Sequence, residues 1–439
     1  MTHTTSQGAA EDEVVELCRD LLRIDTTNTG EAETTVGERV AAEYVAGKLA
    51  EVGLEPTVIE SEPRRTSVIA RVPGADPGRS GLLLHGHLDV VPADGSEWSV
   101  PPFEGIEQDG YLWGRGAIDM KDMDAMMLAL ARHWQRAGIR PPRDVVLAFV
   151  ADEEAGSRKG ARWLADNHPE LFDGCTEAVG EVGGYSVTLR DDLRLYLIQT
   201  AEKGLAWMRL RAHGTPGHGS MVHRDNAVTA LAEAVARLGR HTFPRVLTGT
   251  IRAFVAGLSE ATGVALDPED PAVLDQLATM SKMIGATLSN TANPTMLSAG
   301  YKSNVIPGGA EAVVDGRYLP GQEEEFTKQV DELLGPGVRR EWLVHDIAVE
   351  TSFDGALVDT MVAALRAEDP HAHPVPYMMS GGTDAKSFAQ LGMRCFGFSP
   401  LLLPPDLDFA ALFHGVDERV PVDALKFGVR VLDRLVMTS

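Results

Sequence analysis

The sequence predicts an α/β protein with a mostly parallel sheet, interrupted by a second domain of the α+β type. Strongly apolar runs at residues 81–84 and 144–150 lead into histidine or acidic residues and then into helical patterns, the order that parallel sheets repeat. After Tyr196 the pattern changes to alternating strands and amphipathic helices that resemble a split β-α-β arrangement. We therefore expect two folding units of different class.

This change of pattern sets the expected domain boundaries. Because a chain of 439 residues is too long for one ordinary hydrophobic core, two domains are the natural expectation. The first is expected over residues 1–199 and 351–439, and the second over residues 200–350, with an insertion near 243–293.

Individual elements follow from apolar periodicity and from the residues that end each run. In the first domain we expect a buried strand from Gly81, strands at 66–72, 144–150, 178–181 and 393–398, and helices at 13–24, 34–52, 120–136, 157–167, 358–368 and 422–436. In the second we expect strands at 204–212, 304–317 and 340–349 and helices at 226–238 and 322–334.

Charge and composition exclude some functions. A formal net charge of −24 disfavours nucleic-acid binding, which needs basic stripes to replace phosphate counterions. The cysteines at 18, 175 and 395 are few and far apart, which suits a reducing compartment without disulfides. Since the amino terminus has no apolar signal core and no run approaches a membrane span, we expect a cytoplasmic protein without a membrane partner.

Residues 81–92, G-L-L-L-H-G-H-L-D-V-V-P, are the stretch that indicates chemistry. Three leucines read as a buried strand that delivers His87 and Asp89 to its carboxyl end, where open α/β sheets place their sites. An imidazole can bind a metal through one nitrogen while the other donates to a carboxylate, and Asp89 could be that carboxylate. A histidine satisfied in a tight turn is the structural alternative.

Further acids and a histidine are expected at strand ends of the first domain: Asp119, Glu153, Glu154, Glu181 and His414. Each alone could be a cap or a solvated charge. Together with His87 they form a mixed histidine and carboxylate set that suits zinc. A pair of metals about 3.5–4 Å apart needs a bridging carboxylate, and this set supplies one with Glu153 to spare as a general base.

Competing motifs fail. The glycines at 114 and 116 do not complete a dinucleotide fingerprint, and no serine elbow or phosphate-binding lysine loop occurs. His371-Ala-His373 lies next to prolines without a nearby carboxylate, so we expect a surface loop there.

The motifs that carry a family resemblance are H-G-H-L-D-V-V-P, G-R-G-A-I-D-M-K-D, A-D-E-E-A-G, G-E-V-G-G, T-P-G-H-G-S, N-V-I-P, S-G-G-T-D-A and L-F-H-G-V-D-E. In this order the chain resembles metallopeptidase family M20 over nearly its whole length, a family that includes aminoacylases, carboxypeptidases, deacylases and carnosinase-type dipeptidases. The resemblance implies a zinc-exopeptidase catalytic domain interrupted by a ferredoxin-like lid and dimerisation domain. It also implies a homodimer and a cis peptide bond after Asp119.

Carried over by residue, the resemblance implies two Zn²⁺ per subunit, with Co²⁺ or Mn²⁺ as substitutes. The implied ligands are His87, Asp119 and Glu181 for one ion and Asp119, Glu154 and His414 for the other, with Asp119 as the bridge. Asp89 would orient His87, and Glu153 would be the general base that deprotonates the bridging water. Glu181 is followed by Val182, where many relatives have glycine.

The resemblance also implies a set of substrate contacts. His218 would stabilise the oxyanion, in its own or the partner subunit. A substrate carboxylate would be held by Asn304 and Arg317, with the backbone at Gly381 and Gly382.

The implied activity is hydrolysis of an amide or peptide bond in a small N-acyl amino acid or short peptide with a free carboxylate. Two alternatives stay open: a carbamoyl or ureido amidohydrolase, a branch that often prefers manganese, and a non-hydrolytic relative that serves as a binding module. The spare Glu153 argues against a binding module, which has no use for a base.

Overall fold

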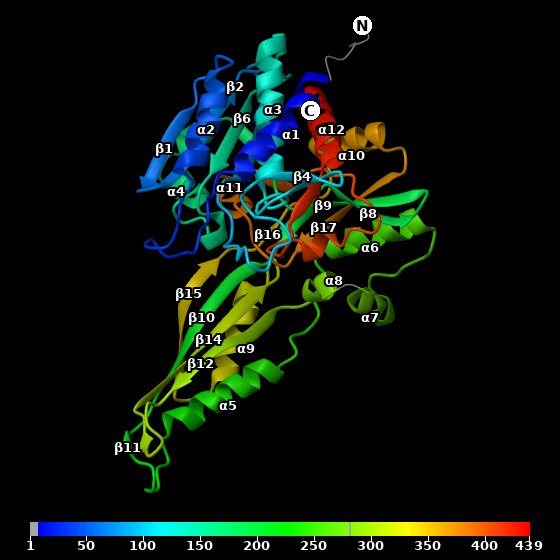
Figure 1. Cartoon of the computed structure of the whole chain (residues 1–439). Helices are drawn as coiled ribbons and strands as arrows, with labels where there is room; N and C mark the ends of the chain where they lie inside the picture. The colour runs from blue at the N-terminus through cyan, green and yellow to red at the C-terminus, as the bar shows by residue number, and fades with distance from the viewer. Residues whose placement is uncertain (1–7, 281) are drawn as a thin grey trace. The chain divides into compact units, whose positions relative to one another are not determined.

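The computed structural model describes residues 8–280 and 282–439, so the first residues of the polar amino terminus lie outside the described part. The chain divides into two compact units. The first comprises Met1–Gln199, Phe353–Pro376 and Thr383–Ser439, and the second comprises Thr200–Ser352 and Tyr377–Gly382. Figure 1 shows the course of the chain.

The first unit contains these elements, with β9 and β17 continuing into residues of the second: helices α1 (Gly8–Leu22), α2 (Arg39–Ala50), α3 (Lys121–Ala137), α4 (Ala161–Asn167), α10 (Ala356–Glu368), α11 (Ala385–Ala389) and α12 (Val422–Thr438); short 3₁₀ turns η1 (Glu153–Ala155), η2 (Pro169–Phe172) and η3 (Phe409–Ala411); and strands β1 (Thr57–Glu62), β2 (Arg65–Val72), β3 (Gly81–His87), β4 (Ile106–Gln108), β5 (Tyr111–Trp113), β6 (Val145–Val150), β7 (Cys175–Gly180), β8 (Tyr185–Arg190), β9 (Leu193–Glu202), β17 (Ala372–Met379), β18 (Arg394–Gly397) and β19 (Arg419–Pro421).

The main sheet of this unit runs β1-β2-β6-β3-β7-β18-β9. Its centre is parallel, because β3 pairs in parallel with β6 and β7, and β7 pairs in parallel with β18. The pairs toward either side, β1–β2, β2–β6 and β18–β9, are antiparallel. The predicted α/β class with a mostly parallel sheet is confirmed.

Alternation along the central strands sends side chains into two separate cores. In β6, Val145, Leu147 and Phe149 pack into the core formed with α1, α3 and α12. Val146, Ala148 and Val150 point the other way, into the core beneath α4 and α11. Because both faces are covered, the strand is a continuous apolar run, as parallel strands in α/β proteins are.

Two local expectations for this unit were wrong. The helix expected from residue 157 begins only at Ala161, because Ser157 has a left-handed backbone and closes a turn to Gly160. His371-Ala-His373 was expected in a surface loop, but Ala372–Met379 is a strand, β17. Proline cannot donate to a strand ladder, and β17 tolerates Pro374 and Pro376 because, among the described strands, it pairs with β9 alone.

The second unit contains helices α5 (Ala227–Arg240), α6 (Gly249–Thr262), α7 (Pro271–Met280), α8 (Lys282–Ala286) and α9 (Glu323–Leu334), and strands β10 (Gly204–His213), β11 (Gly217–His218), β12 (Thr291–Ala299), β13 (Val305–Ile306), β14 (Gly309–Tyr318), β15 (Val338–Asp346) and β16 (Val349–Glu350). Its antiparallel sheet has the order β12-β14-β10-β15, and α5 and α9 pack on it around Leu231, Val314 and Phe326. Along the chain the order is βαββαβ, the ferredoxin-like arrangement. Helices α6, α7 and α8 form the insertion between α5 and β12.

Among the described residues, no disulfide joins Cys18, Cys175 and Cys395. None of the helices that the structure describes has the length and hydropathy of a membrane span. The cytoplasmic location expected from the sparse cysteines stays a prediction.

Candidate metal centre

Three neighbouring parallel strands deliver the first part of the candidate site. His87 is the last residue of β3, Glu153 and Glu154 form the turn η1 just beyond β6, and Glu181 follows β7. Because β6, β3 and β7 are adjacent and parallel, their carboxyl ends meet at one edge of the sheet.

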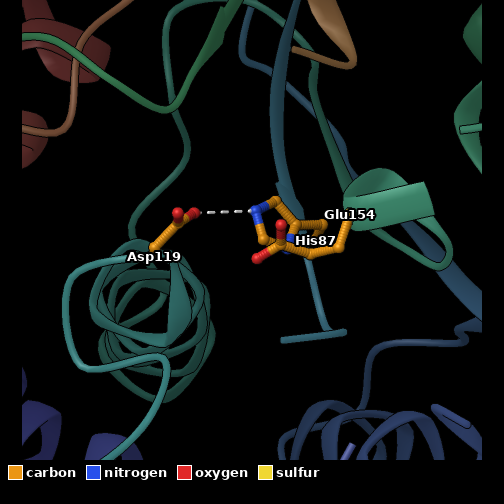
Figure 2. Close-up of side chains that lie close together, drawn as sticks. All are labelled: His87, Asp119 and Glu154. Atoms are coloured by element: carbon orange, nitrogen blue, oxygen red, sulfur yellow. Dashed lines mark hydrogen bonds and ion pairs between the residues drawn. The ribbon is translucent and has the colours of Figure 1, made fainter. Parts of the chain in front are cut away.

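The other two residues arrive differently from the expectation that all lie at ends of the sheet strands. Asp119 lies two residues before α3, and its peptide bond to Met120, the N-cap residue, is cis, as the resemblance implies. His414 lies in the loop between η3 and β19. Figure 2 shows His87, Asp119 and Glu154 converging from three separate elements.

The Asp119 carboxylate lies between two imidazoles. His87 Nε2 is 3.1 Å from Asp119 Oδ1, and His414 Nε2 is 3.2 Å from Asp119 Oδ2. Each imidazole also faces a second carboxylate: His87 Nε2 is 3.5 Å from Glu181 Oε2, and His414 Nε2 is 3.1 Å from Glu154 Oε2. By these distances the residues can be divided into two donor sets that share Asp119. The ligand atoms of His87, Asp119 and Glu154 also lie within 4.8 Å of one another, as do those of His87, Glu153 and Glu181.

These donor sets fit divalent metal ions. Nitrogen and oxygen ligands about 2.0–2.1 Å from a tetrahedral zinc lie roughly 3.3 Å from one another. The observed separations of 3.1–3.5 Å match that spacing. Glu154 Oε1 is buried without a hydrogen-bond partner, which is costly for a carboxylate oxygen unless a cation lies beside it.

The electrostatics of the cluster agree with this fit. Burial raises the pKa of Glu153 well above its usual value, and burial raises the pKa of Glu181 to about 7 although His87 opposes it. Burial would also raise the pKa of Asp119, but His414 and His87 outweigh it and hold that pKa well below its usual value. The contact with Asp119 raises the pKa of His414 to about 10. The ionised form of these buried carboxylates is therefore stabilised by nearby positive charge, which divalent cations can supply.

Asp89 supports the site in a way that the sequence did not indicate. His87 Nδ1 lies 2.9 Å from the backbone carbonyl of Asp89, whereas the nearer carboxylate oxygen is 3.6 Å away. The Asp89 carboxylate instead accepts the backbone N–H groups of Glu153 and Glu154, each at 3.1 Å. Asp89 thus orients the imidazole through its backbone and holds the η1 turn through its side chain.

Two residues behind this turn were not predicted. Asn28 donates to Asp89 Oδ2 at 2.7 Å, and its own carbonyl accepts from Arg65 at 2.7 Å. Arg65 is buried and also pairs with Glu38 at 2.6 Å and with Asp152 at 3.2 Å. In the sequence Asn28 lies in a polar stretch that reads as an ordinary turn, so no local pattern reveals its partners.

Val182 explains why a glycine suits the position after Glu181. Its φ of 56° lies in the left-handed region, where a β-branched residue is a genuine outlier. Such strain costs about 1–3 kcal/mol and persists only where the surroundings enforce it.

We expect Val182→Gly to raise the free energy of unfolding by about 1 kcal/mol, because the relief of strain exceeds the entropy that glycine costs. Chemical denaturation measures this. Val187→Gly is the control: Val187 is an exposed residue of β8 with an ordinary backbone, so the same change should destabilise the protein there. Destabilisation by both substitutions would remove the strain argument.

The remaining predicted residues belong to the second unit. His218 and Asn304 are neighbours, because His218 pairs with Val305 across β11 and β13 and Gly219 donates to the Asn304 carbonyl at 2.9 Å. The His218 Nδ1 lies 2.8 Å from the Ser220 hydroxyl oxygen and 3.2 Å from the Ser220 backbone nitrogen, so Ser220 contacts this ring nitrogen and not Nε2.

Arg317 lies on β14, apart from that pair in the strand order. Its guanidinium binds the Asp315 carboxylate with two hydrogen bonds, at 2.7 and 3.2 Å, and lies over the Trp207 ring. Gly381 and Gly382 lie in the bend after β17. The contribution of these second-unit residues to substrate binding stays a prediction.

The parallel sheet and the shared-carboxylate cluster at its edge define the class of α/β metallohydrolases. The sequence profile of peptidase family M20/M25/M40 matches residues 83–438, and the chain belongs to this family. It is accordingly a metal-dependent hydrolase that acts on amide bonds.

Relatives in sequence and in structure agree with this assignment. The chain is 27% identical to N-fatty-acyl-amino acid synthase/hydrolase PM20D1 of Xenopus tropicalis, over 97% of this chain and 86% of the relative. It is 28% identical to aminoacylase-1 of Sus scrofa, over 96% and 94%.

Among solved structures, the M20 metallo-carboxypeptidase Sso-CP2 of Sulfolobus solfataricus superposes with a TM-score of 0.75 at 19% identity, over 97% of this chain and 99% of that one. YXEP of Bacillus subtilis, described as a dinuclear metal-binding peptidase of this family, superposes with a TM-score of 0.62 at 14% identity, over 98% of each chain. Both likenesses support the fold.

Proposed function

We propose that this protein uses two zinc ions to hydrolyse the amide bond of small N-acyl amino acids, or of short peptides that keep a free carboxylate. The observation that carries the proposal is the position of Asp119, whose two carboxylate oxygens each face a different histidine. That is the disposition of a carboxylate shared by two metals.

In this proposal His87 and Glu181 hold one ion, Glu154 and His414 hold the other, and Asp119 contributes to both. The ions, when bound, supply Lewis acidity that polarises the scissile carbonyl and lowers the pKa of water. The protein's part is to fix the ligands: η1 is anchored by Asp89, and His87 is fixed through its Nδ1.

Glu153 is the proposed general base. Its backbone is held by Asp89, and its carboxylate lies near His87 and Glu181. It accepts a proton from the attacking water as the oxygen forms a bond to the carbonyl carbon. It then delivers that proton to the nitrogen as the C–N bond breaks, so that a carboxylic acid and a free amine result.

The substrate contacts in the second unit complete the proposal. Because Ser220 contacts His218 at Nδ1, the Nε2 of His218 is the ring nitrogen that would donate to the developing oxyanion. Arg317 offers a planar guanidinium to the substrate carboxylate. Asn304 and the backbone at Gly381 and Gly382 are proposed to bind the same carboxylate.

The substrate class rests on the names of the relatives. One is described as acting on N-fatty-acyl amino acids and another as an aminoacylase, so both names concern amino acids acylated on nitrogen. The chemistry that these two names share is an acylated amine next to a free carboxylate.

The experiment is a panel of N-acetyl, N-succinyl and N-fatty-acyl amino acids, dipeptides and N-carbamoyl amino acids, assayed on the zinc-loaded and the manganese-loaded protein. Release of amine from N-acyl amino acids or dipeptides supports the proposal. Turnover of N-carbamoyl substrates alone, with manganese, would favour the carbamoyl alternative. Tight binding of substrates without turnover would favour the binding module.

We also propose a homodimer formed through the second unit. Strand β12 is at one end of the sheet, and no described strand pairs with its outer edge. It exposes Met296 and Leu297 at 66% and 62% of their surface. Natural proteins rarely leave an apolar edge strand open to water, and a second copy of the same edge would cover it.

We expect the double substitution Met296→Glu and Leu297→Glu to weaken dimerisation by at least about 30-fold, since burying two carboxylates in an apolar interface costs more than 2 kcal/mol. Sedimentation velocity over a range of concentrations measures this. Val264→Glu, at an exposed position outside β12, is the control and should leave the dimer intact. A wild-type protein that sediments as a monomer at all concentrations would contradict the proposal.

A further inference from the structure

A single buried carboxylate joins the two loops that carry Asp119 and His414. Glu418 Oε1 accepts the backbone N–H groups of Ile118 at 2.8 Å and Asp119 at 3.2 Å. Its other oxygen accepts the backbone N–H of Gly116 at 2.9 Å. Glu418 is fully buried, so these bonds are shielded from water. The loop before α3 is thus built around one side chain from 300 residues further along the chain.

Arg115 connects the same carboxylate to the other loop. Its guanidinium binds Glu418 Oε2 at 2.7 Å and donates to the Gly415 carbonyl at 3.0 Å and the His414 carbonyl at 3.5 Å. It is also buried and lies over the Trp98 ring. Because the guanidinium is rigid and planar, it fixes the distance between the groups that it bridges.

We propose that Glu418 and Arg115 are positioning residues for the metal centre: they hold the backbone at Asp119 and at His414 in register, so that both side chains reach the same ions. The inference rests on the proposed two-metal function. It concerns how the shared ligand and one terminal ligand, which come from opposite ends of the sequence, are kept at metal-binding distance.

The geometry favours this role over a merely stabilising ion pair. Apart from the bond between them, the hydrogen bonds of Glu418 and Arg115 end on backbone groups beside or at Asp119 and His414. The two residues themselves lie outside both donor sets. The left-handed backbone of His414, with φ of 57°, needs external support of this kind. Residues that orient metal ligands typically change metal affinity about 10–100-fold when they are replaced.

The experiment compares zinc binding by the full-length wild type, Glu418→Gln and Arg115→Lys, measured by competition with a chromogenic chelator. Glu418→Gln keeps the shape of the side chain but turns an amide N–H₂ toward backbone donors. We expect it to weaken at least one zinc site by about 10–100-fold. Arg115→Lys keeps the charge beside Glu418 but loses the fork that reaches the second loop, and we expect a smaller loss, about 10-fold.

Glu368→Gln is the matched control. Glu368 pairs with Arg430 and Arg434 between α10 and α12, in the same unit, and none of its hydrogen bonds reaches the donor sets. It should lose thermal stability but keep zinc affinity. Wild-type zinc affinity in both Glu418→Gln and Arg115→Lys, or an equal loss of zinc affinity in Glu368→Gln, would overturn the inference. If Glu418→Gln does not fold, the zinc affinity of Arg115→Lys tests the inference by itself. A wild type that binds fewer than two zinc ions would instead refute the proposed function.

Discussion

Glu153→Gln is expected to lower kcat by roughly 10²–10⁴-fold, the usual contribution of a general base, while zinc content and thermal stability stay close to those of the wild type. Glutamine has nearly the same shape and can still receive the water by a hydrogen bond, but it cannot take the proton. Because the proton transfer that is lost stabilises the transition state and not the bound substrate, KM should change little.

The structure makes this expectation discriminating, because Glu153 lies close enough to His87 and Glu181 to be a metal ligand itself. The adjacent Glu154→Gln is the comparison. Glu154 faces His414 at 3.1 Å and leaves one oxygen without a partner, so its substitution should release a metal ion. Loss of zinc from Glu153→Gln, with zinc retained in Glu154→Gln, would mean that Glu153 is the metal ligand and Glu154 the general base.

The centre of the fold could be predicted because its pattern is local. Strands β3 and β6 are buried on both faces, so each is an unbroken apolar run in the sequence, and the residues at their ends are polar. Adjacent parallel strands then bring His87 and the Glu153-Glu154 turn together without further information. His87, Glu153 and Glu154 could therefore be expected close together from the strand pattern, whereas the division of the ligands between two ions was implied only by the family resemblance.

The supporting contacts could not be predicted, because they join residues far apart in the chain and obey no periodicity. Asn28 reaches Asp89 across 61 residues, and Arg115 reaches Glu418 across 303. Nothing near Glu418 in the sequence marks it as buried. Similarly, the proline-flanked His373 lies in a strand because tertiary pairing with β9 overrides its local pattern.

The helices of the insertion could not be predicted either. Helices α6 and α7 have short apolar patterns with acidic turns between them, and no helix was assigned there from the sequence. Their apolar side chains pack into a small separate core with Ile251, Leu274 and Leu288 rather than into the main cores. A core that small leaves only a weak trace in the sequence.

The substitution Asp119→Asn should reduce kcat/KM by roughly 10³–10⁴-fold, because an amide cannot serve as a charged bridge and several kcal/mol of charge stabilisation are lost. It should also reduce zinc content to at most one tightly bound ion per chain, since both donor sets share this one carboxylate. Elemental analysis after dialysis, together with initial rates, measures both effects.

Asp369→Asn separates this outcome from the general cost of neutralising a buried aspartate. Asp369 is buried and pairs with Arg194 and Tyr196, so its loss should lower stability and leave zinc and turnover unchanged. Glu153→Gln and Asp119→Asn then fail in different ways: the first keeps its metals and loses proton transfer, whereas the second loses metal first. Retention of two zinc ions by Asp119→Asn would mean that the ions do not share this residue, and the two-metal arrangement would have to be drawn with another bridge.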